Sequence, residues 1–313
     1  MPNRGTIVTR LASALRANGH EIIVAPVGGE RGAQRYLRAR VQVAEAVARV
    51  RPQILHIHYG MSGLAVPSLR VPIVTSFYGD DLNGTWHPIV GTTLKSHLGT
   101  LVSQMTAARS ARCIAVSKAL RDKLWLKAWR QKTAVIRDAV DPGLFRPLPQ
   151  EDARRRLGLC DKGVLVLFPH DVTQATKRVE LARQAVDAFK ASGMRAELWI
   201  VNGKPPDEMP LYYAAADVML ITSAREGGPS SAKEALACGV PVVSVSTGDL
   251  ELFDDAPDGM FRSDPRPADL SRALSRAIEP RNSPRRSLLP KGLTLQAAVQ
   301  AMDAVYRAAV GPR

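Results

Sequence analysis

The sequence has little cysteine and no long apolar run. Its 313 residues include three cysteines, Cys113, Cys160 and Cys238, an odd number with neither metal-ligand nor redox spacing. We expect all three to be buried, reduced thiols of a cytoplasmic protein. No apolar run approaches the ~20 residues that a membrane-spanning helix needs, and the N-terminus lacks the apolar core of a signal peptide.

Several common motifs are also missing. There is no Walker A sequence, no Gly-x-Gly-x-x-Gly opening a βαβ unit and no repeat of fixed period, which argues against conventional kinases and dehydrogenases. Aromatic residues make up only 5% of the chain and no nucleic-acid-binding motif is present, so nucleic acid is not an expected partner.

What the sequence does have is positive charge and core material. A net charge of +14 predicts attraction to an anionic partner, either a membrane surface, phosphorylated small molecules or nucleic acid. With 45% hydrophobic residues in a chain of this length, two domains are expected.

Helical periodicity alternates with short apolar runs along the first part of the chain, the pattern of a parallel sheet covered by helices. Residues 1–5 are expected to form a loop. The predicted helices are 6–18 and 34–51, and the predicted strands are 21–25, 54–58, 72–77, 113–116 and 133–136.

A second domain of the same type follows the turn-rich linker 141–149. Its predicted strands are 164–168, 197–201, 218–222 and 242–245. The fold class is therefore α/β, with two doubly wound, Rossmann-like domains facing across a cleft, at residues 1–140 and 141–313. Such sheets bind ligands at the carboxyl ends of their strands. We expect a C-terminal helix at about residues 294–309 to pack back on the first domain.

Residues 222–241 carry the most informative motif. A strand leads into Gly227-Gly228, where backbone can approach a ligand, and a helix follows from Ser230 to Gly239. The helix start offers free N–H groups and the positive end of a dipole, a site for phosphate. Glu226 and Glu234 flank this turn and suit sugar hydroxyls; the alternative for each is a solvated surface glutamate.

These glutamates and glycines, with the Lys-Glu-Ala-Leu-Ala-Cys-Gly-Val-Pro-Val-Val continuation, resemble the donor-site signature of glycosyltransferase family 4, whose members have the GT-B fold. The resemblance extends over nearly the whole chain. It includes residues 52–60, 114–118, 140–147 and 215–218.

The resemblance implies a donor-binding second domain and an acceptor-side first domain. Glu226 would contact the transferred sugar, the Gly227-Gly228 backbone the sugar and diphosphate, and Glu234 the ribose hydroxyls. Further donor-binding positions are Lys177, Arg178, Ser230, Ser231 and, at the end of the family's N-terminal glycine loop, Gly5.

Three features depart from the family pattern. The family's Gly-Arg pair is absent before Lys177, so Lys177-Arg178 has an ordinary solvated helix start as its alternative. Tyr78 replaces the usual histidine on the acceptor side, near Asp81 and His58; tyrosine accepts protons poorly, and its alternative is a half-buried strand-end aromatic. The chain also begins inside the first glycine loop, so either the start codon is misplaced or the first sheet lacks its usual central strand.

The implied activity is transfer of a sugar from a nucleotide-sugar donor, with retention of configuration, to a glycan or lipid-linked acceptor. The leaving phosphate would help to deprotonate the acceptor, and fixed cations and dipoles would stabilise it. No cofactor is expected. No metal is expected either, because Asp-x-Asp is absent and His56 and His58 have no third ligand nearby. A non-catalytic nucleotide-sugar-binding or nucleic-acid-binding protein and a GT-B epimerase are the alternatives.

Residues 118–130 combine basic side chains with Trp125 and Trp129 at helical spacing. This pattern predicts an anionic membrane surface as a partner, with the protein peripheral to the inner face of the membrane. The alternative is that both tryptophans belong to the domain core beneath a solvated basic face.

Overall fold

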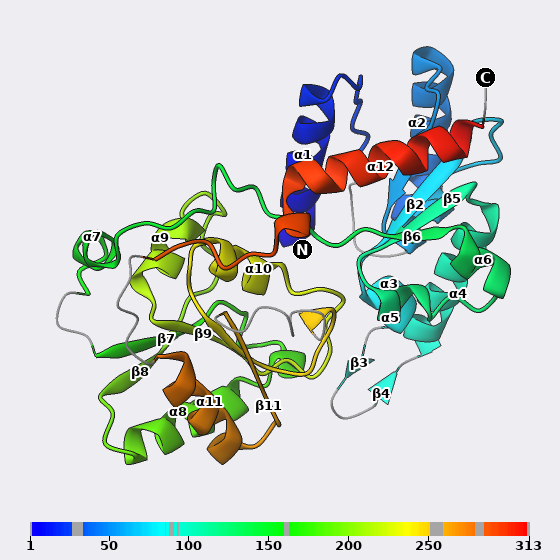
Figure 1. Ribbon diagram of the computed structural model, residues 1–313. Helices are drawn as coiled ribbons and strands as arrows, with labels where there is room; N and C mark the ends of the chain where they lie inside the picture. Colours follow the sequence, from blue (N-terminus) through cyan, green and yellow to red (C-terminus); the bar gives the residue numbers. More distant parts are fainter. Residues whose placement is uncertain are drawn as a thin grey trace. The chain divides into compact units, whose positions relative to one another are not determined.

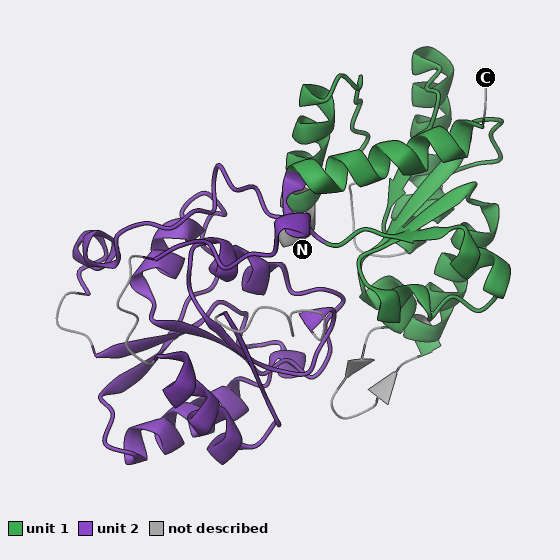
Figure 2. Cartoon of the chain, in the orientation of Figure 1, with its two compact units in different colours: residues 1–137, 296–313 green, residues 138–295 purple. Residues whose placement is uncertain are grey.

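The computed structural model describes residues 2–26, 34–84, 86–87, 91–92, 94–159, 163–250, 259–278 and 285–311. Figure 2 shows the chain divided into two compact units, residues 1–137 with 296–313, and residues 138–295. We call them unit 1 and unit 2. The predicted domains were 1–140 and 141–313.

Unit 1 contains a parallel sheet in the order β1-β2-β5-β6. The strands are β1 (Leu55–His58), β2 (Ile73–Phe77), β5 (Arg112–Ala115) and β6 (Thr133–Val135), close to the four predicted ranges. Every residue of β2 is buried, as expected for a strand inside a parallel sheet. The small antiparallel pair β3 (Trp86–His87) and β4 (Gly91–Thr92) lies outside this sheet.

The helices of unit 1 are α1 (Pro2–Ala17), α2 (Gln34–Val50), η1 (Gly60–Ala65), α3 (Asp80–Asn83), α4 (Leu94–Arg109), α5 (Lys118–Arg121), α6 (Lys127–Gln131) and α12 (Leu295–Val310). Tyr36, Ala39 and Val43 of α2 pack in one buried cluster with Ile57 and Ile73 of the sheet. Their spacing puts them on one helical face, so the apolar stripe of α2 covers the sheet.

Two predictions for unit 1 were wrong. The expected loop at residues 1–5 is helical from Pro2 onward, because α1 begins there. The expected strand at 21–25 has no regular structure, and Ile23 and Val24 are 55% and 50% exposed. A strand needs ladder partners, and no described strand pairs with this segment. The carbonyl of Ile22 instead accepts hydrogen bonds from the Arg16 guanidinium.

Unit 2 contains a five-stranded sheet in the order β11-β10-β9-β7-β8, and every pairing is parallel. Its strands are β7 (Val164–Phe168), β8 (Ala196–Ile200), β9 (Val218–Ile221), β10 (Val242–Val245) and β11 (Met260–Ser263). Four of them were predicted. The sequence analysis missed β11, a four-residue strand with the short sequence Met-Phe-Arg-Ser.

The helices of unit 2 are α7 (Gln150–Arg156), η2 (Ala175–Lys177), α8 (Val179–Ala191), α9 (Met209–Ala215), α10 (Ser230–Ala237), α11 (Pro267–Ala277) and η4 (Lys291–Leu293). Figure 1 shows α8 and α11 together on one side of the sheet and α9 and α10 on the other. Residues 141–149 contain no helix or strand, as predicted for the linker.

Alternate residues of the central strands enter opposite cores. Val166 and Phe168 pack with α8 and α11, whereas Leu167 belongs to the cluster that contains α10. Successive strand side chains point to opposite faces, so a strand buried on both sides must be apolar throughout. Unit 2 is therefore a doubly wound α/β sheet, and both units have the predicted parallel α/β architecture.

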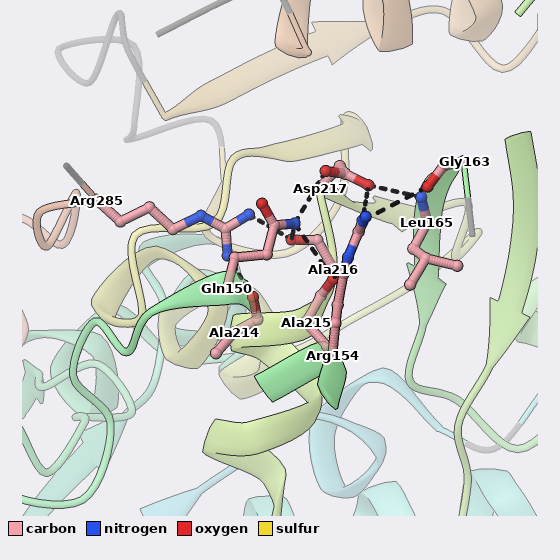
Figure 3. Close-up of polar contacts among 9 residues, drawn as sticks. All are labelled: Gln150, Arg154, Gly163, Leu165, Ala214, Ala215, Ala216, Asp217 and Arg285. Carbon is pink, nitrogen blue, oxygen red and sulfur yellow. Dashed lines mark hydrogen bonds and ion pairs between the residues drawn. The ribbon is translucent and has the colours of Figure 1, made fainter. Parts of the chain in front are cut away.

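The amino end of β9 is fixed by a polar cluster around Asp217 (Figure 3). Its carboxylate accepts hydrogen bonds from Arg154 at 2.6 Å, from Gln150 at 2.9 Å and from the backbone N–H of Leu165 at 2.7 Å. Arg285 donates to the carbonyls of Ala214 and Ala216, just before β9. These bonds hold the start of β9 against β7.

Two of the three cysteines lie in the described residues, and both are buried free thiols, as predicted. Burial raises the pKa of Cys113 to about 11 and that of Cys238 to about 12, so neither thiol is reactive near neutral pH. Cys160 lies outside the described residues. None of the described helices is both long and apolar enough to cross a membrane.

Candidate functional site

The strand order of unit 2 indicates where a ligand would be expected to bind. Along the chain, β8 is added on one side of β7 and β9 on the other, so the topology switches direction between β7 and β9. Ligands of doubly wound sheets bind at such a switch point, beyond the carboxyl ends of the strands. The loops that follow these strands are residues 169–178 and 222–229, and they contain predicted site residues.

Lys177 and Glu226 meet at this point. Lys177 Nζ lies 2.6 Å from Glu226 Oε1, and the two side chains are 17% and 15% exposed. The two loops are also joined through the backbone, since the N–H of Ala224 donates to the carbonyl of Thr176 at 2.9 Å. The structure thus brings a half-buried lysine and glutamate together at the switch point.

Arg178 points into the backbone at the end of β9. Its Nε donates to the Thr222 carbonyl at 2.5 Å, and the Thr222 hydroxyl contacts the carbonyls of Lys177 and Arg178 at 2.7 and 3.0 Å. Arg178 has a left-handed backbone (φ 50°), which costs about 1–3 kcal/mol in a residue other than glycine. These contacts with Thr222 offset that cost and fix the loop that carries Lys177.

Helix α10 begins beside the glycine loop without a side-chain cap. Its N-cap residue is Pro229, and no side chain caps this helix in the described part of the chain. The Ser230 hydroxyl donates to Asp138 Oδ2 at 3.3 Å, and Ser231 is half-buried. The first N–H groups of a helix have no intrahelical partners, so α10 presents donors suited to an anion.

Packing within the fold does not require a glycine at position 228. Gly227 and Gly228 are not among the described glycines with positive φ. A Cβ on Gly228 would lie 3.4 Å from the Asp249 carboxylate and the Lys233 ammonium, an ordinary van der Waals distance. Gly248 differs, because it has φ +65° and a Cβ there would lie 3.1 Å from Pro229 and 3.2 Å from Glu226.

A buried charged cluster beneath this loop was missed by the sequence analysis. Lys233 and Asp249 are completely buried, with Nζ and Oδ2 2.7 Å apart. Burial raises the pKa of Asp138 to about 6, and the Lys233 ammonium opposes that shift. Lys233 belongs to the motif at residues 222–241, but the sequence analysis gave it no role. Asp138 and Asp249 gave no signal of their own, because only folding brings them to α10.

Two further side chains come from the same elements: Glu234 lies in α10, and His170 lies in the loop that follows β7. Glu234 is half-buried and its Oε2 accepts a hydrogen bond from the buried hydroxyl of Tyr213 at 3.0 Å. The His170 imidazole packs edge-on against Phe168. Burial, with a smaller effect of Lys177, lowers the pKa of His170 to about 3, so this ring is neutral.

In unit 1, Tyr78 and His58 form a hydrogen-bonded pair. Tyr78 follows β2 and is half-buried, and its hydroxyl lies 2.6 Å from His58 Nδ1. Burial lowers the pKa of His58 to about 4. The His56 and His58 rings lie on one strand face, as predicted, with centroids 4.2 Å apart. His56 Nδ1 lies 2.7 Å from the Tyr306 hydroxyl, which joins α12 to this strand.

Asp81 holds the turn that carries Tyr78. Its side chain is buried, and its carboxylate accepts hydrogen bonds from the backbone N–H groups of Gly60, Tyr78 and Gly79 at 2.9–3.3 Å. Gly5, expected at the end of a glycine loop, lies within helix α1 instead. Among the described residues, no group of three or more His, Cys, Asp and Glu side chains is placed to hold a metal ion.

The segment 118–130 is not one amphipathic helix. It forms the short helices α5 and α6 with a turn between them. Trp125 in the turn is 56% exposed, whereas Trp129 in α6 is half-buried against the core of unit 1. One tryptophan therefore fits the surface interpretation and the other fits the core interpretation.

Two family models match the chain. The model of Glycosyltransferase Family 4 matches residues 6–144, and that of Glycosyl transferases group 1 matches residues 154–287. The first match falls almost entirely in unit 1, and the second lies within unit 2.

Curated relatives include D-inositol 3-phosphate glycosyltransferases from several organisms. The protein from Acidothermus cellulolyticus is 30% identical over 181 residues, which are 47% of this chain and 40% of that protein. The protein from Thermomonospora curvata is 29% identical over 298 residues, 80% of this chain and 68% of that protein. The chain thus spans 40% and 68% of the lengths of these two relatives.

Solved structures share the fold at low identity. A glycosyltransferase from Rickettsia africae superimposes with a TM-score of 0.72 and 15% identity, over 98% of this chain and 95% of that one. HepE from Anabaena in complex with UDP-glucose gives a TM-score of 0.57 and 18% identity, over 86% and 78%. With both halves matched by family models and with this architecture, the chain belongs to the family 4 glycosyltransferases of the GT-B fold.

Proposed function

We propose that this protein transfers a sugar from a nucleotide-sugar donor to a glycan or lipid-linked acceptor with retention of anomeric configuration. The observation that carries the proposal is the half-buried Lys177–Glu226 pair at the switch point of unit 2, beside the uncapped start of α10. A diphosphate needs cations and N–H donors, and a sugar needs carboxylate acceptors. This corner of the unit supplies all three.

In this proposal Lys177 and the first turn of α10, with Ser230 and Ser231, bind the diphosphate. Glu226 contacts the transferred sugar and shares Lys177 with the phosphates. Departure of the diphosphate develops negative charge, which a fixed ammonium and fixed N–H dipoles stabilise without reorganisation. The presence of UDP-glucose in the HepE structure supports a nucleotide sugar as the donor.

Glycine at 227 and 228 admits the donor close to the backbone. Packing within the fold would accept a Cβ at Gly228, so in this proposal the glycine serves to leave room for the ligand. Glu234 binds the ribose hydroxyls. Arg178 contributes chiefly by fixing the loop through Thr222, since its Nε already donates to that backbone.

On the acceptor side, Tyr78 orients the sugar and does not act as a base. The neutral His58 ring holds the Tyr78 hydroxyl, and Asp81 holds the Tyr78 backbone. A retaining transfer in which the leaving phosphate takes the acceptor proton requires no protein base at this position. Cytoplasmic location, independence of metal and an anionic membrane partner belong to the same proposal.

The decisive experiment measures donor binding and transfer with a panel of nucleotide sugars. Lys177→Met should weaken binding of the preferred donor by about 1.5–3 kcal/mol, because a hydrogen-bonded charge on the diphosphate is lost. Isothermal calorimetry measures this loss. Lys190→Met, in the exposed part of α8, is the matched control and should bind like the parent.

Two outcomes would contradict the proposal. Equal donor affinity in Lys177→Met and the parent would remove the diphosphate assignment. Tight donor binding without release of nucleoside diphosphate, for any acceptor offered, would favour the non-catalytic nucleotide-sugar-binding protein.

Tyr78→Phe separates orientation from base catalysis. Loss of one neutral hydrogen bond is worth about 0.5–1.5 kcal/mol, so turnover should fall by about two- to tenfold while donor affinity stays unchanged. Steady-state kinetics with the preferred pair of substrates measure both. If Tyr78→His instead raises turnover far above the parent, the position requires a base and the orienting role is wrong.

A further inference from the structure

Helix α4 presents its large apolar side chains outward. Leu94, Leu98, Leu101 and Met105 are 85%, 59%, 40% and 57% exposed, and their spacing of four, three and four residues puts them on one face of the helix. A helix that only covers a core would place such a stripe inward.

The inward face of α4 is small and polar because η1 approaches it closely. Ser103 and Thr106 are buried, and the Thr106 hydroxyl donates to the Gly60 carbonyl at 2.9 Å. A Cβ on Gly60 would lie 2.5 Å from Ser103, and one on Gly63 would lie 2.0 Å from Thr106. This packing leaves no room for a leucine on the inward face of α4, but it does not explain why leucines occupy the outward face.

The turn between α5 and α6 extends the stripe. Gln104 of α4 donates to the Lys123 carbonyl at 3.0 Å and accepts from the Trp125 N–H at 3.1 Å, so the turn lies against the helix next to Met105. Trp125 and Leu126 are 56% and 52% exposed. Figure 1 shows α4, α5 and α6 in the same part of unit 1. We call Leu94, Leu98, Leu101, Met105, Trp125 and Leu126 the outer stripe.

The sequence around the outer stripe is strongly basic. Residues 94–132 contain nine lysines and arginines and a single acid, Asp122. Lys118, Lys123 and Lys127 are exposed around the turn. A second copy of the chain would bring the same positive charge to the contact and be repelled. An anionic surface is attracted, and a fluid bilayer accepts protruding side chains without matching their shape.

We propose that the outer stripe and its lysines form a docking face for an anionic lipid bilayer. The apolar side chains enter the boundary between headgroups and acyl chains, and the lysines stay at the level of the phosphates. This surface replaces the single helix that the segment 118–130 suggested. The docking face rests on the anionic membrane partner of the proposed function and names the surface that meets it. It needs no donor, so it can be tested separately from sugar transfer.

Sedimentation with phosphatidylglycerol vesicles and with phosphatidylcholine vesicles tests the proposal on the full chain. The parent should bind the anionic vesicles at low salt and lose much of that binding at high salt. The double variant Leu98→Ser, Leu101→Ser should partition at least about tenfold less. Lys123→Glu, Lys127→Glu should remove the preference for phosphatidylglycerol.

Matched controls use exposed residues elsewhere. Val41→Ser, at a side chain 62% exposed in α2, and Arg276→Glu, in α11 of unit 2, should sediment like the parent. Thermal unfolding checks that each variant is folded. Nucleotide-sugar binding should stay unchanged in the stripe variants, so failure of membrane docking is distinguishable from failure of the proposed function.

Three results would overturn the proposal: no sedimentation of the folded parent with anionic vesicles at low salt, equal binding by the leucine double variant, or equal loss in the Val41→Ser control. Analytical ultracentrifugation supplies a fourth. If the parent self-associates, the leucine variant is monomeric and vesicles are not bound, the stripe is an interface between copies of the chain.

Discussion

The two ends of strand β9 both carry half-buried ionic groups, but they use them differently. At the amino end, the Asp217 carboxylate receives donors from Arg154, Gln150 and the Leu165 backbone. At the carboxyl end, Lys177 and Glu226 contact each other beside a helix start without a side-chain cap. The first cluster joins parts of the chain to one another; the second stands next to N–H donors and an open glycine position.

This difference suggests how the surroundings of a charged cluster indicate whether it serves folding or ligand binding. Where side chains and backbone of the same unit saturate a carboxylate, removing it should damage folding. Where backbone donors and glycine space surround an ion pair, removing it should damage binding. Three changes test this distinction, from the largest expected effect to the smallest.

Asp217→Ala should lower the free energy of unfolding by about 2–4 kcal/mol, because the half-buried Arg154 guanidinium and the Leu165 N–H lose their acceptor. Urea denaturation measures the loss. Donor affinity of the folded fraction should not change.

The control for that change is Asp152→Ala, which removes an exposed ion pair with Arg155 in the same helix as Arg154. It should cost less than about 0.5 kcal/mol. Equal losses in both variants would show that the Asp217 cluster does not hold β9.

Asp138→Asn should remove a pH dependence of stability. Because the native pKa of Asp138 is raised from 3.8 to about 6, the native state binds more protons than the unfolded state in that window. Stability should therefore fall as pH rises from about 4 to about 6. The side chain keeps some exposure, so we expect about 1–2 kcal/mol and not the full shift.

Urea denaturation of the parent and of Asp138→Asn across that pH range measures the difference between them. The difference in unfolding free energy between the two proteins should change by about 1–2 kcal/mol between about pH 4 and about pH 6. Parallel curves for the two proteins would mean that burial does not raise the pKa of Asp138.

Glu234→Gln should weaken donor binding about tenfold and leave stability within about 0.5 kcal/mol. The amide oxygen still accepts from Tyr213, so the variant loses only the charge that the proposed function assigns to the ribose hydroxyls. Calorimetry with the preferred donor measures the change. Tyr213→Phe is the control for the internal hydrogen bond, and an affinity loss there equal to that of Glu234→Gln would make Glu234 a packing residue.

Much of the fold could be predicted because it is local in the sequence. Apolar runs such as 164–168 and the periodicity of α2 report burial directly, and both became the expected elements. The segment 21–25 has the same apolar character and failed, because a strand also needs a neighbour. The strand β11 was missed for the opposite reason, since its pairing with β10 stabilises a segment in which only Met260 and Phe261 are apolar.

The candidate site was likewise predicted only in part. The motif from Thr222 to Pro241 indicated the glycine loop, Glu226 and the helix start, because each needs a particular residue type at a particular spacing. The roles of Asp138 and Asp249 were invisible, since neither belongs to a local pattern. Arg178 and Asp81 illustrate a further limit, because their backbone partners are known only once the chain is folded.

By itself, the sequence determined the alternation of helices and strands and the two-part organisation, because periodicity and composition carry that information along the chain. The family followed from the resemblance of its motifs to those of known members. Only the tertiary structure decided which charges meet and which surfaces stay uncovered. The burial of Lys233 against Asp249 and the outward leucines of α4 both depend on how closely neighbouring elements approach. That distance is set by packing in three dimensions, which no run of residues specifies alone.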